Sequence, residues 1–175
     1  MPGKTEIRES LPGDMARIGT LYPDAFPEED LLPLVRDLLQ ETALVLSLVG
    51  IVDASLAGHI LFTTCGMDGK SDKLALLGPL AVAPACQRQG IGSALVRAGL
   101  QRLENAGVTQ VCVLGDPAYY GRLGFIPEED VTPPYPLPDE WRGAWQSIKL
   151  RHVELPCRGR LVVPQPWRQP ALWGA

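Results

Sequence analysis

The sequence predicts an α/β domain in which helices cover a mixed sheet. Apolar runs rich in β-branched residues recur along the chain, and amphipathic segments with helical spacing lie between them. A glycine-bearing loop joins one buried strand to the opening of a helix. We expect a single domain over residues 1–163, followed by a tail over residues 164–175.

The first forty residues predict one strand and two helices. Lys4–Glu9 alternates polar and apolar residues, and Pro12-Gly13-Asp14 has the chemistry of a turn with a helix N-cap. A first helix should follow. Glu28–Gln40 has acidic residues in its first turn and an apolar face, and Pro33 suits either a helix that opens there or a kink.

The middle of the chain predicts three strands and the helix that follows the loop. Ala43–Val52 and Leu56–Cys65 flank turn residues 53–55 and form a hairpin, and Leu74–Val82 continues the sheet. Gln89–Ala106 has apolar residues at helical spacing and ends before Gly107, a normal helix stop.

The last third predicts short elements. In order, these are a buried strand at 108–114, a helix at 117–123, a proline-rich stretch at 133–138, and strands at 144–150 and 159–163. The tail contains prolines and two tryptophans, so it cannot form a regular helix. It could lie across the domain, lie across a second subunit of a homodimer, or be loose.

Composition excludes several classes of function. No apolar run reaches the ~18 residues of a membrane span, and the first twenty residues lack a signal-peptide core, so we expect a cytoplasmic protein with no membrane partner. The net charge of -4 offers no general attraction for nucleic acid. Two histidines and four scattered cysteines cannot supply the common zinc motifs, so no metal is expected and the cysteines are interpreted as packing thiols.

The most informative stretch is the loop after the strand that ends at Val82. Its glycines, Gly90 and Gly92, open a helix, where unpaired N–H groups and the helix dipole favour an anion. Arg88 supplies local positive charge. The spacing excludes G-x-G-x-x-G, because Leu95 stands where a small residue is needed, and no Walker A string occurs. A ligand-free turn is the alternative.

The pattern that remains, Q-x-x-G-x-G, resembles the acetyl-CoA loop of the GCN5-related N-acetyltransferase (GNAT) family. Tyr120-Gly121-Arg122-Leu123-Gly124-Phe125 is similar to the Y-x-x-x-G-F signature of the same family. The strings L-G-P-L-A-V at 77–82 and G-D-P-A-Y-Y at 115–120 resemble a bacterial YhbS-like subgroup. The resemblance covers roughly residues 4–127.

The resemblance implies a mixed, mostly antiparallel sheet with a splayed central strand pair and helices on both faces. It also implies direct transfer of the acetyl group of acetyl-CoA, a cosubstrate, to a primary amine of a small molecule or a protein. The implied coenzyme-binding residues are Leu80, Ala81 and Val82 on the strand, and Gln87, Arg88, Gln89, Gly90, Ile91, Gly92 and Ser93 in the loop and first helical turn. Tyr120 matches the usual acid that protonates the leaving thiolate, whereas Tyr119 points elsewhere and is expected to pack.

Two departures from the family pattern leave alternatives open. Many members carry a glutamate on the strand before the loop, but Leu76-Leu77-Gly78-Pro79 has no acid. The base would then be His59 or a water chain, although His59 equally suits a hydrogen-bonded core position. The asparagine that often follows the fifth strand is replaced by Gly115-Asp116-Pro117. A catalytically weak or inactive acyl-CoA sensor or interaction module is therefore the alternative function.

The acceptor and the preferred acyl chain are left open by the sequence. In the family, the first two helices, their loop and the last strands build the acceptor pocket. The corresponding residues here are Tyr22, Asp24, Phe26, Glu28, Trp141 and Trp145. These aromatic and acidic residues suit a cation but equally suit packing at a rim.

Overall fold

The computed structural model describes residues 4–150 and 158–174. The chain divides into two compact units, of which the first comprises Met1–Phe62 and Gly78–Gln101 and the second comprises Thr63–Leu77 and Arg102–Ala175. Strands β3 (Ser55–Met67) and β4 (Lys70–Val82) and helix α3 (Ile91–Asn105) contribute to both units. The predicted fold class is confirmed, because the described residues form a mixed, mostly antiparallel sheet of nine strands together with helices.

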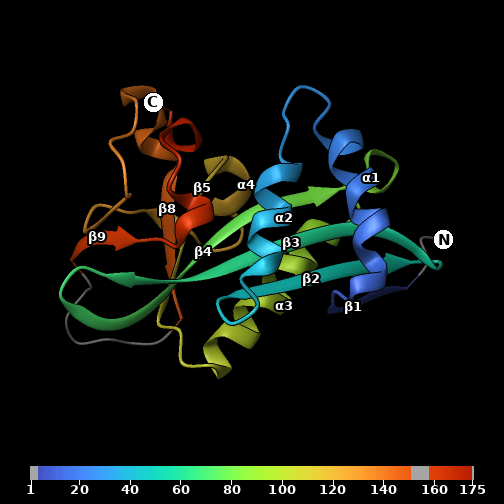
Figure 1. Ribbon diagram of the computed structural model, residues 1–175, viewed down its shortest axis with the longest axis horizontal. Coiled ribbons are helices and arrows are strands. Elements are labelled where there is room, and N and C mark those ends of the chain that lie inside the picture. Colours follow the sequence, from blue (N-terminus) through green and yellow to red (C-terminus); the bar gives the residue numbers. More distant parts are fainter. Residues whose placement is uncertain (1–3, 151–157, 175) are drawn as a thin grey trace. The chain divides into compact units, whose positions relative to one another are not determined.

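The first unit places helices on both faces of its strands. Strand β1 (Thr5–Glu9) pairs antiparallel with β2 (Val45–Val52), and β2 neighbours β3. Helices α1 (Met15–Ala25) and α2 (Leu32–Gln40) lie on one face of these strands, and α3 lies on the other (Figure 1). Apolar side chains that are almost fully buried fill the space between the layers: Ile18, Leu38, Leu48, Val49, Ile60, Leu61 and Leu95.

Helix α2 begins later than its sequence predicts. Its first residue is Leu32, and Pro33 lies in its first turn. Of the two alternatives for Pro33, a helix that opens there is therefore correct, and the proline causes no kink. Glu28–Asp30 precede the helix rather than forming its first turn. Leu34, Val35 and Leu38 are buried, as the apolar face predicts.

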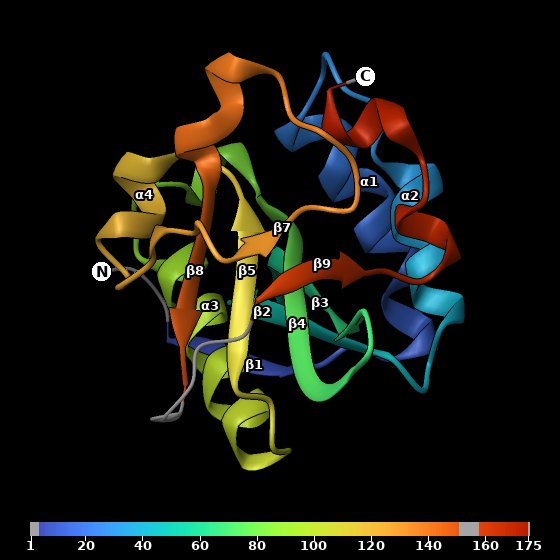
Figure 2. The ribbon, with the colours of Figure 1, turned by 90° about the vertical axis from the view of Figure 1, so that its left-hand side faces the viewer.

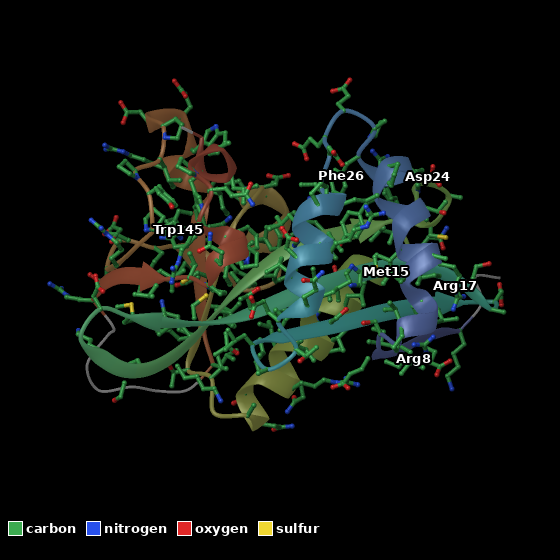
Figure 3. All side chains as sticks on the ribbon, in the orientation of Figure 1. Arg8, Met15, Arg17, Asp24, Phe26 and Trp145 are labelled. Carbon is green, nitrogen blue, oxygen red and sulfur yellow. The ribbon has the colours of Figure 1, made fainter. Side chains whose placement is uncertain are left out.

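Asp14 has a different role from the predicted helix cap. Its carboxylate makes no cap bond to α1. It pairs with Arg8 (Nη1 to Oδ2, 2.8 Å) and Arg17 (Nη2 to Oδ1, 2.9 Å), and it accepts the N–H of Leu11 at 2.7 Å. Arg8 and Arg17 lie at the same end of α1 (Figure 3). The hydrogen bond from Arg8 is the main cause that lowers the pKa of Asp14, although the side chain is buried.

The second unit consists mainly of short strands. Strands β5 (Gln110–Leu114), β6 (Ile126–Pro127) and β8 (Trp145–Lys149) continue the sheet from β4 in the order β4-β5-β8-β6, with β4 and β5 parallel. Strand β9 (Gly159–Val162) pairs with the end of β3 and with β7 (Val131–Thr132). Figure 2 shows β4, β5 and β8 side by side, with β9 crossing in front of β4. Sequence periodicity did not predict the two-residue strands β6 and β7.

The described part of the tail packs within the second unit. It forms two 3-10 turns, Gln165–Trp167 and Pro170–Trp173. Trp173 is 1% exposed, its ring centroid lies 5.8 Å from that of Trp145, and its Nε1 donates to the carbonyl of Trp167 at 3.0 Å. Trp167 in turn donates from Nε1 to Oγ1 of Thr63 at 3.1 Å. Of the three alternatives left open for the tail, the structure therefore shows the first for residues 164–174, which pack against their own chain. Within the described ranges, no helix is both long and apolar enough to cross a membrane.

Candidate functional site

The glycine loop joins β4 to α3 in the first unit, as predicted. Strand β4 ends at Val82, a 3-10 turn occupies Pro84–Cys86, and α3 begins at Ile91. The carbonyl of Gly90 accepts the N–H of Ala94 at 3.0 Å, so Gly90 is the N-cap residue. The N–H groups of the next three residues therefore have no partner within the helix, and the helix dipole adds positive potential around them. This arrangement can bind a phosphate group.

Two loop residues adopt left-handed backbone conformations. Gly90 has φ +82, which glycine adopts without strain, and Arg88 has φ +63, which is uncommon for a residue with a side chain. Turns of this kind can direct successive N–H groups toward one anion. A Cβ at Gly90 would meet no described heavy atom within 4 Å. The space directly beside Gly90 is therefore open.

The two loop glutamines bind the backbone around the loop. Nε2 of Gln87 donates to the carbonyl of Val82 at 3.1 Å, and Nε2 of Gln89 donates to the carbonyl of Ala85 at 3.4 Å. Arg88 is exposed and is the cationic side chain among the candidate loop residues. The glutamine side chains thus hold the loop in place, and only the arginine side chain offers charge to an anion.

Glycines in β2 and β3 let α3 lie close to the sheet. Ile91 is 3% exposed, so its side chain belongs to the core although its N–H lies in the first helical turn. A Cβ at Gly58 would lie 2.9 Å from Cδ1 of Leu95 and 3.1 Å from Cγ2 of Ile91, and a Cβ at Gly50 would lie 3.3 Å from the same Ile91 atom. Both glycines therefore fix the position of the helix end that forms the loop. Sequence reasoning missed them, because close approach to a distant helix leaves no local pattern.

Strand β4 loses one of its neighbours shortly before the loop. Its ladder with β5 runs from Leu74↔Gln110 to Leu77↔Val113, and no later pair joins these strands within the described residues. The ladder ends immediately before Gly78-Pro79, where proline has no N–H to donate to a neighbouring strand. Beyond the break, Leu80 and Val82 are half-buried and Ala81 is 1% exposed. The N–H of Ala83 donates to the carbonyl of Ala57 at 2.8 Å, so the end of this segment remains hydrogen-bonded to β3.

Tyr120 lies in the second unit on helix α4 (Pro117–Gly121). Asp116 caps this helix by accepting the N–H of Ala118 at 3.0 Å, and Pro117 occupies the first position, which proline favours. The ring of Tyr120 packs edge-on against Phe125, with centroids 5.6 Å apart, and against Tyr119, with centroids 5.0 Å apart. Burial is the main cause that raises the pKa of Tyr120, so its hydroxyl stays protonated at neutral pH.

His59 lies in the core of the first unit. It is 0% exposed, Nδ1 lies 2.7 Å from the Tyr22 hydroxyl, and Nε2 lies 2.8 Å from Oγ of Ser47. Burial lowers the pKa of His59 to about 4, so the ring is neutral at pH 7 but a weak base. Both nitrogens are thus engaged with neighbours, which favours the core interpretation over a role as general base.

The residues suggested for an acceptor pocket divide into two kinds. Tyr22 is 1% exposed and bound to His59, and Trp145 is 3% exposed and donates from Nε1 to the carbonyl of Val131 at 2.7 Å. The side chains of Tyr22 and Trp145 therefore belong to the core. Asp24 and Phe26 lie at the end of α1 opposite Arg8 and Arg17 (Figure 3). Phe26 is half-buried.

A cavity of about 320 Å³ lies between α1 and α2 in the first unit. It is lined by Tyr22, Pro23, Phe26, Pro27, Glu28, Glu29, Asp30, Leu31 and Leu32. Its lining therefore combines two aromatic residues, Tyr22 and Phe26, with three exposed acidic residues. Trp141, the remaining suggested residue, is 38% exposed and lies in the second unit. Among residues 4–150 and 158–174, no cluster of His, Cys, Asp and Glu is arranged to hold a metal ion.

The sequence of this chain is similar to a known protein family and to curated proteins. The family model described as "Acetyltransferase (GNAT) family" matches residues 15–125, a span that includes both the glycine loop and the tyrosine motif. The uncharacterized N-acetyltransferase YjhQ of Escherichia coli (strain K12) is 34% identical over 140 residues, which cover 76% of this chain and 77% of YjhQ.

The fold of this chain is also similar to solved structures. The GNAT family N-acetyltransferase YhbS from Escherichia coli, crystallised in complex with CoA, superimposes with a TM-score of 0.84 at 28% identity. That match covers 95% of this chain and 93% of YhbS. A GNAT family acetyltransferase from Brucella melitensis, in complex with acetyl-CoA, gives a TM-score of 0.75 at 30% identity and covers 94% of this chain and 98% of its own.

Proposed function

The chain belongs to the acetyltransferase (GNAT) family, and on that premise we propose that it transfers the acetyl group of acetyl-CoA directly to a primary amine. The observation that carries this proposal is the anion-binding geometry of residues 88–93, with two left-handed residues before a helix N-terminus. The CoA and acetyl-CoA held by the similar YhbS and Brucella proteins support the same cosubstrate here.

We propose that the coenzyme binds along β4 and the loop. The backbone N–H groups from Arg88 to Ser93 hold the pyrophosphate, and the exposed Arg88 guanidinium adds charge to it. The backbone of Leu80, Ala81 and Val82 pairs with the pantetheine arm as an added strand would. The end of the β4–β5 ladder at Leu77 supports this role, because pairing with β5 stops before these residues begin.

The chemistry requires three proton transfers, because two protons leave the nitrogen and one reaches the departing thiolate. A free alkylamine has a pKa near ~10.4, so the attacking amine must first lose a proton, which passes to water in the absence of a suitable side chain. The nitrogen then bonds to the thioester carbon, and the N–H of Val82 is a suitable donor to the resulting oxyanion. The nitrogen, now positively charged, releases its second proton to water, so the product is a neutral amide. The carbon–sulfur bond breaks, and the thiolate receives a proton from Tyr120, which regains one from solvent. Because burial raises the pKa of Tyr120, it acts mainly by donating a hydrogen bond while the thiolate forms.

We propose that the acceptor reaches the enzyme as an ammonium ion. The acidic rim of the cavity between α1 and α2, with Glu28, Glu29 and Asp30, would attract such a cation before it is deprotonated. A small-molecule amine and a protein amine both fit this chemistry.

Calorimetric titration with acetyl-CoA tests the coenzyme site first. Absence of binding at about 1 mM ligand contradicts the proposal whatever the fold. A panel of amines, assayed by release of free CoA thiol, then tests turnover. Tyr120→Phe keeps the ring and should barely change coenzyme affinity, but it should lower kcat by ~10²-fold. Tyr119→Phe is the matched control, and equal small effects from both variants contradict the assignment of Tyr120.

A coenzyme A sensor or interaction module is the second candidate. Its support is that Leu76-Leu77-Gly78-Pro79 contains no acid and that His59, the nearest substitute suggested by the sequence, is buried and hydrogen-bonded at both nitrogens. Tight binding of acetyl-CoA together with no turnover across the amine panel would favour the sensor over the enzyme.

A further inference from the structure

We propose that Gly115 is a positioning residue for Tyr120. Because it has no side chain, it leaves the space that the Tyr120 ring occupies. This inference rests on the proposed role of Tyr120. Gly115 follows directly after β5, at the start of the turn that leads to α4, and both residues belong to the second unit. A family asparagine is replaced by Gly115-Asp116-Pro117 at this turn, and the geometry indicates what the glycine does instead.

The ring of Tyr120 occupies the space that a side chain at Gly115 would need. A Cβ at Gly115 would lie 2.5 Å from Cε2, 3.0 Å from Cδ2 and 3.5 Å from Cζ of Tyr120. Ordinary van der Waals contact begins at 3.4 Å. The ring edge would therefore have to move by about 1 Å, which is a large displacement in a packed interior. Cζ carries the hydroxyl, so the proton donor would move with the ring.

The backbone of Gly115 is held on both sides and cannot easily yield. Its N–H donates to the carbonyl of Ala144 at 2.9 Å, and its carbonyl accepts Nε2 of Gln146 at 3.1 Å. Gln146 is 1% exposed, and the ladder of β5 with β8 reaches Leu114↔Trp145 immediately beside it. Gly115 does not have a positive φ, so its backbone conformation would accept an alanine. The three nearest heavy atoms that an added Cβ would meet all belong to the Tyr120 ring, so the ring is the obstacle that favours glycine here.

The ring is also confined by its other neighbours. Phe125 and Tyr119 both contact it edge-on, and the side chain of Tyr120 is 9% exposed. The N–H of Phe125 donates to the Tyr120 carbonyl at 3.2 Å, which ties this part of the turn to the same helix. An added methyl group at Gly115 would thus push the ring against packed atoms rather than into solvent.

The kinetic test compares Gly115→Ala with Gly121→Ala. Gly121 adjoins Tyr120 on α4, has no positive φ, and a Cβ there would meet no heavy atom of the described residues within 4 Å. We expect Gly115→Ala to lower kcat by ~10-fold or more, because misplacement by about 1 Å is costly in catalysis. The KM for acetyl-CoA should stay within about twofold, since the proposed coenzyme contacts lie in other residues. Gly121→Ala should leave kcat unchanged.

A double variant separates positioning from a general loss of structure. In a Tyr120→Phe background the hydroxyl is already absent, so Gly115→Ala should lower kcat by less than about twofold further. Equal fold losses in the wild-type and Tyr120→Phe backgrounds would overturn the proposal. If Tyr120→Phe itself leaves kcat unchanged, the assignment of Tyr120 as the acid fails, and the kinetic test no longer applies.

A stability measurement tests the contact without any assay of activity. Urea unfolding should show a lower midpoint for Gly115→Ala than for wild type, and the lowering should disappear in a Tyr120→Ala background, where the obstructing ring is gone. If Gly115→Ala does not fold but the double variant does, the same conclusion follows. A midpoint shift of equal size in both backgrounds would mean that the added methyl meets something other than the ring, and the proposal would be wrong.

Discussion

The buried histidine predicts how the stability of the protein depends on pH. His59 is 0% exposed and its pKa in the folded protein is about 4, against an ordinary value of 6.5. Burial disfavours the imidazolium more strongly than the nearby Asp14 carboxylate favours it. Between these two pKa values the unfolded chain binds more protons than the folded protein, so stability must fall as the pH falls through this range.

The size of this loss follows from the two pKa values. Each pKa unit is worth about 1.4 kcal/mol, so His59 alone should lower the free energy of unfolding by about 2 kcal/mol at pH 5 and about 3 kcal/mol at pH 4. Asp14 acts in a separate range. Because its pKa is depressed, its contribution persists above the ordinary aspartate value and is lost only at lower pH. The interval from pH 7 to 5 therefore reports mainly on His59.

Urea unfolding at several pH values checks this prediction against the variant His59→Gln. The variant lacks the titrating group, so it should start from a lower stability but lose about 2 kcal/mol less than wild type between pH 7 and 5. A histidine ring signal in NMR that does not shift above pH 5 would give direct support. Parallel losses of stability in the two proteins would refute the reasoning, because the histidine would then be as accessible to protons in the folded state as in the unfolded one.

Three further substitutions test separate parts of the structure. Gly90→Asp places a carboxylate at a left-handed position beside the proposed phosphate site, and calorimetry should show at least ~10-fold weaker binding of acetyl-CoA by a folded variant; unchanged affinity would move the phosphate site elsewhere. Trp173→Ala should lower the free energy of unfolding by about 3–5 kcal/mol, and a loss below about 1 kcal/mol would mean that the tail does not help to stabilise the second unit. Gly99→Ala makes a Cβ overlap the ring of Phe62 and should lower the free energy of unfolding by about 1–3 kcal/mol. Adding Phe62→Leu should recover most of this loss, whereas no recovery would place the strain elsewhere.

Local pattern was sufficient for the order of the longer helices and strands and for the loop. The predicted Gln89–Ala106 helix appears as Ile91–Asn105, and the hairpin turn at Asp53-Ala54 appears with two left-handed residues. The loop could be predicted because strand, glycines and helix are adjacent in the chain, and the unpaired N–H groups of a helix end are a local property. The predicted start of helix α2 at Glu28 was wrong, since the helix begins at Leu32. Acidic residues before a proline give the same pattern whether they open a helix or precede it.

The sequence by itself indicated which residues could form an anion site, since strand, glycines and helix are adjacent in the chain, and its resemblance to the GNAT family implied Tyr120 as the acid. Only the tertiary structure decided the roles that depend on distant neighbours. The sequence left His59 between base and core, and Ser47 and Tyr22 place it in the core. Gly58 and Gly115 show no signal in their own segments, yet each leaves space for a side chain from another element. Packing at van der Waals distance is set by which elements meet, and a one-dimensional pattern does not contain that information.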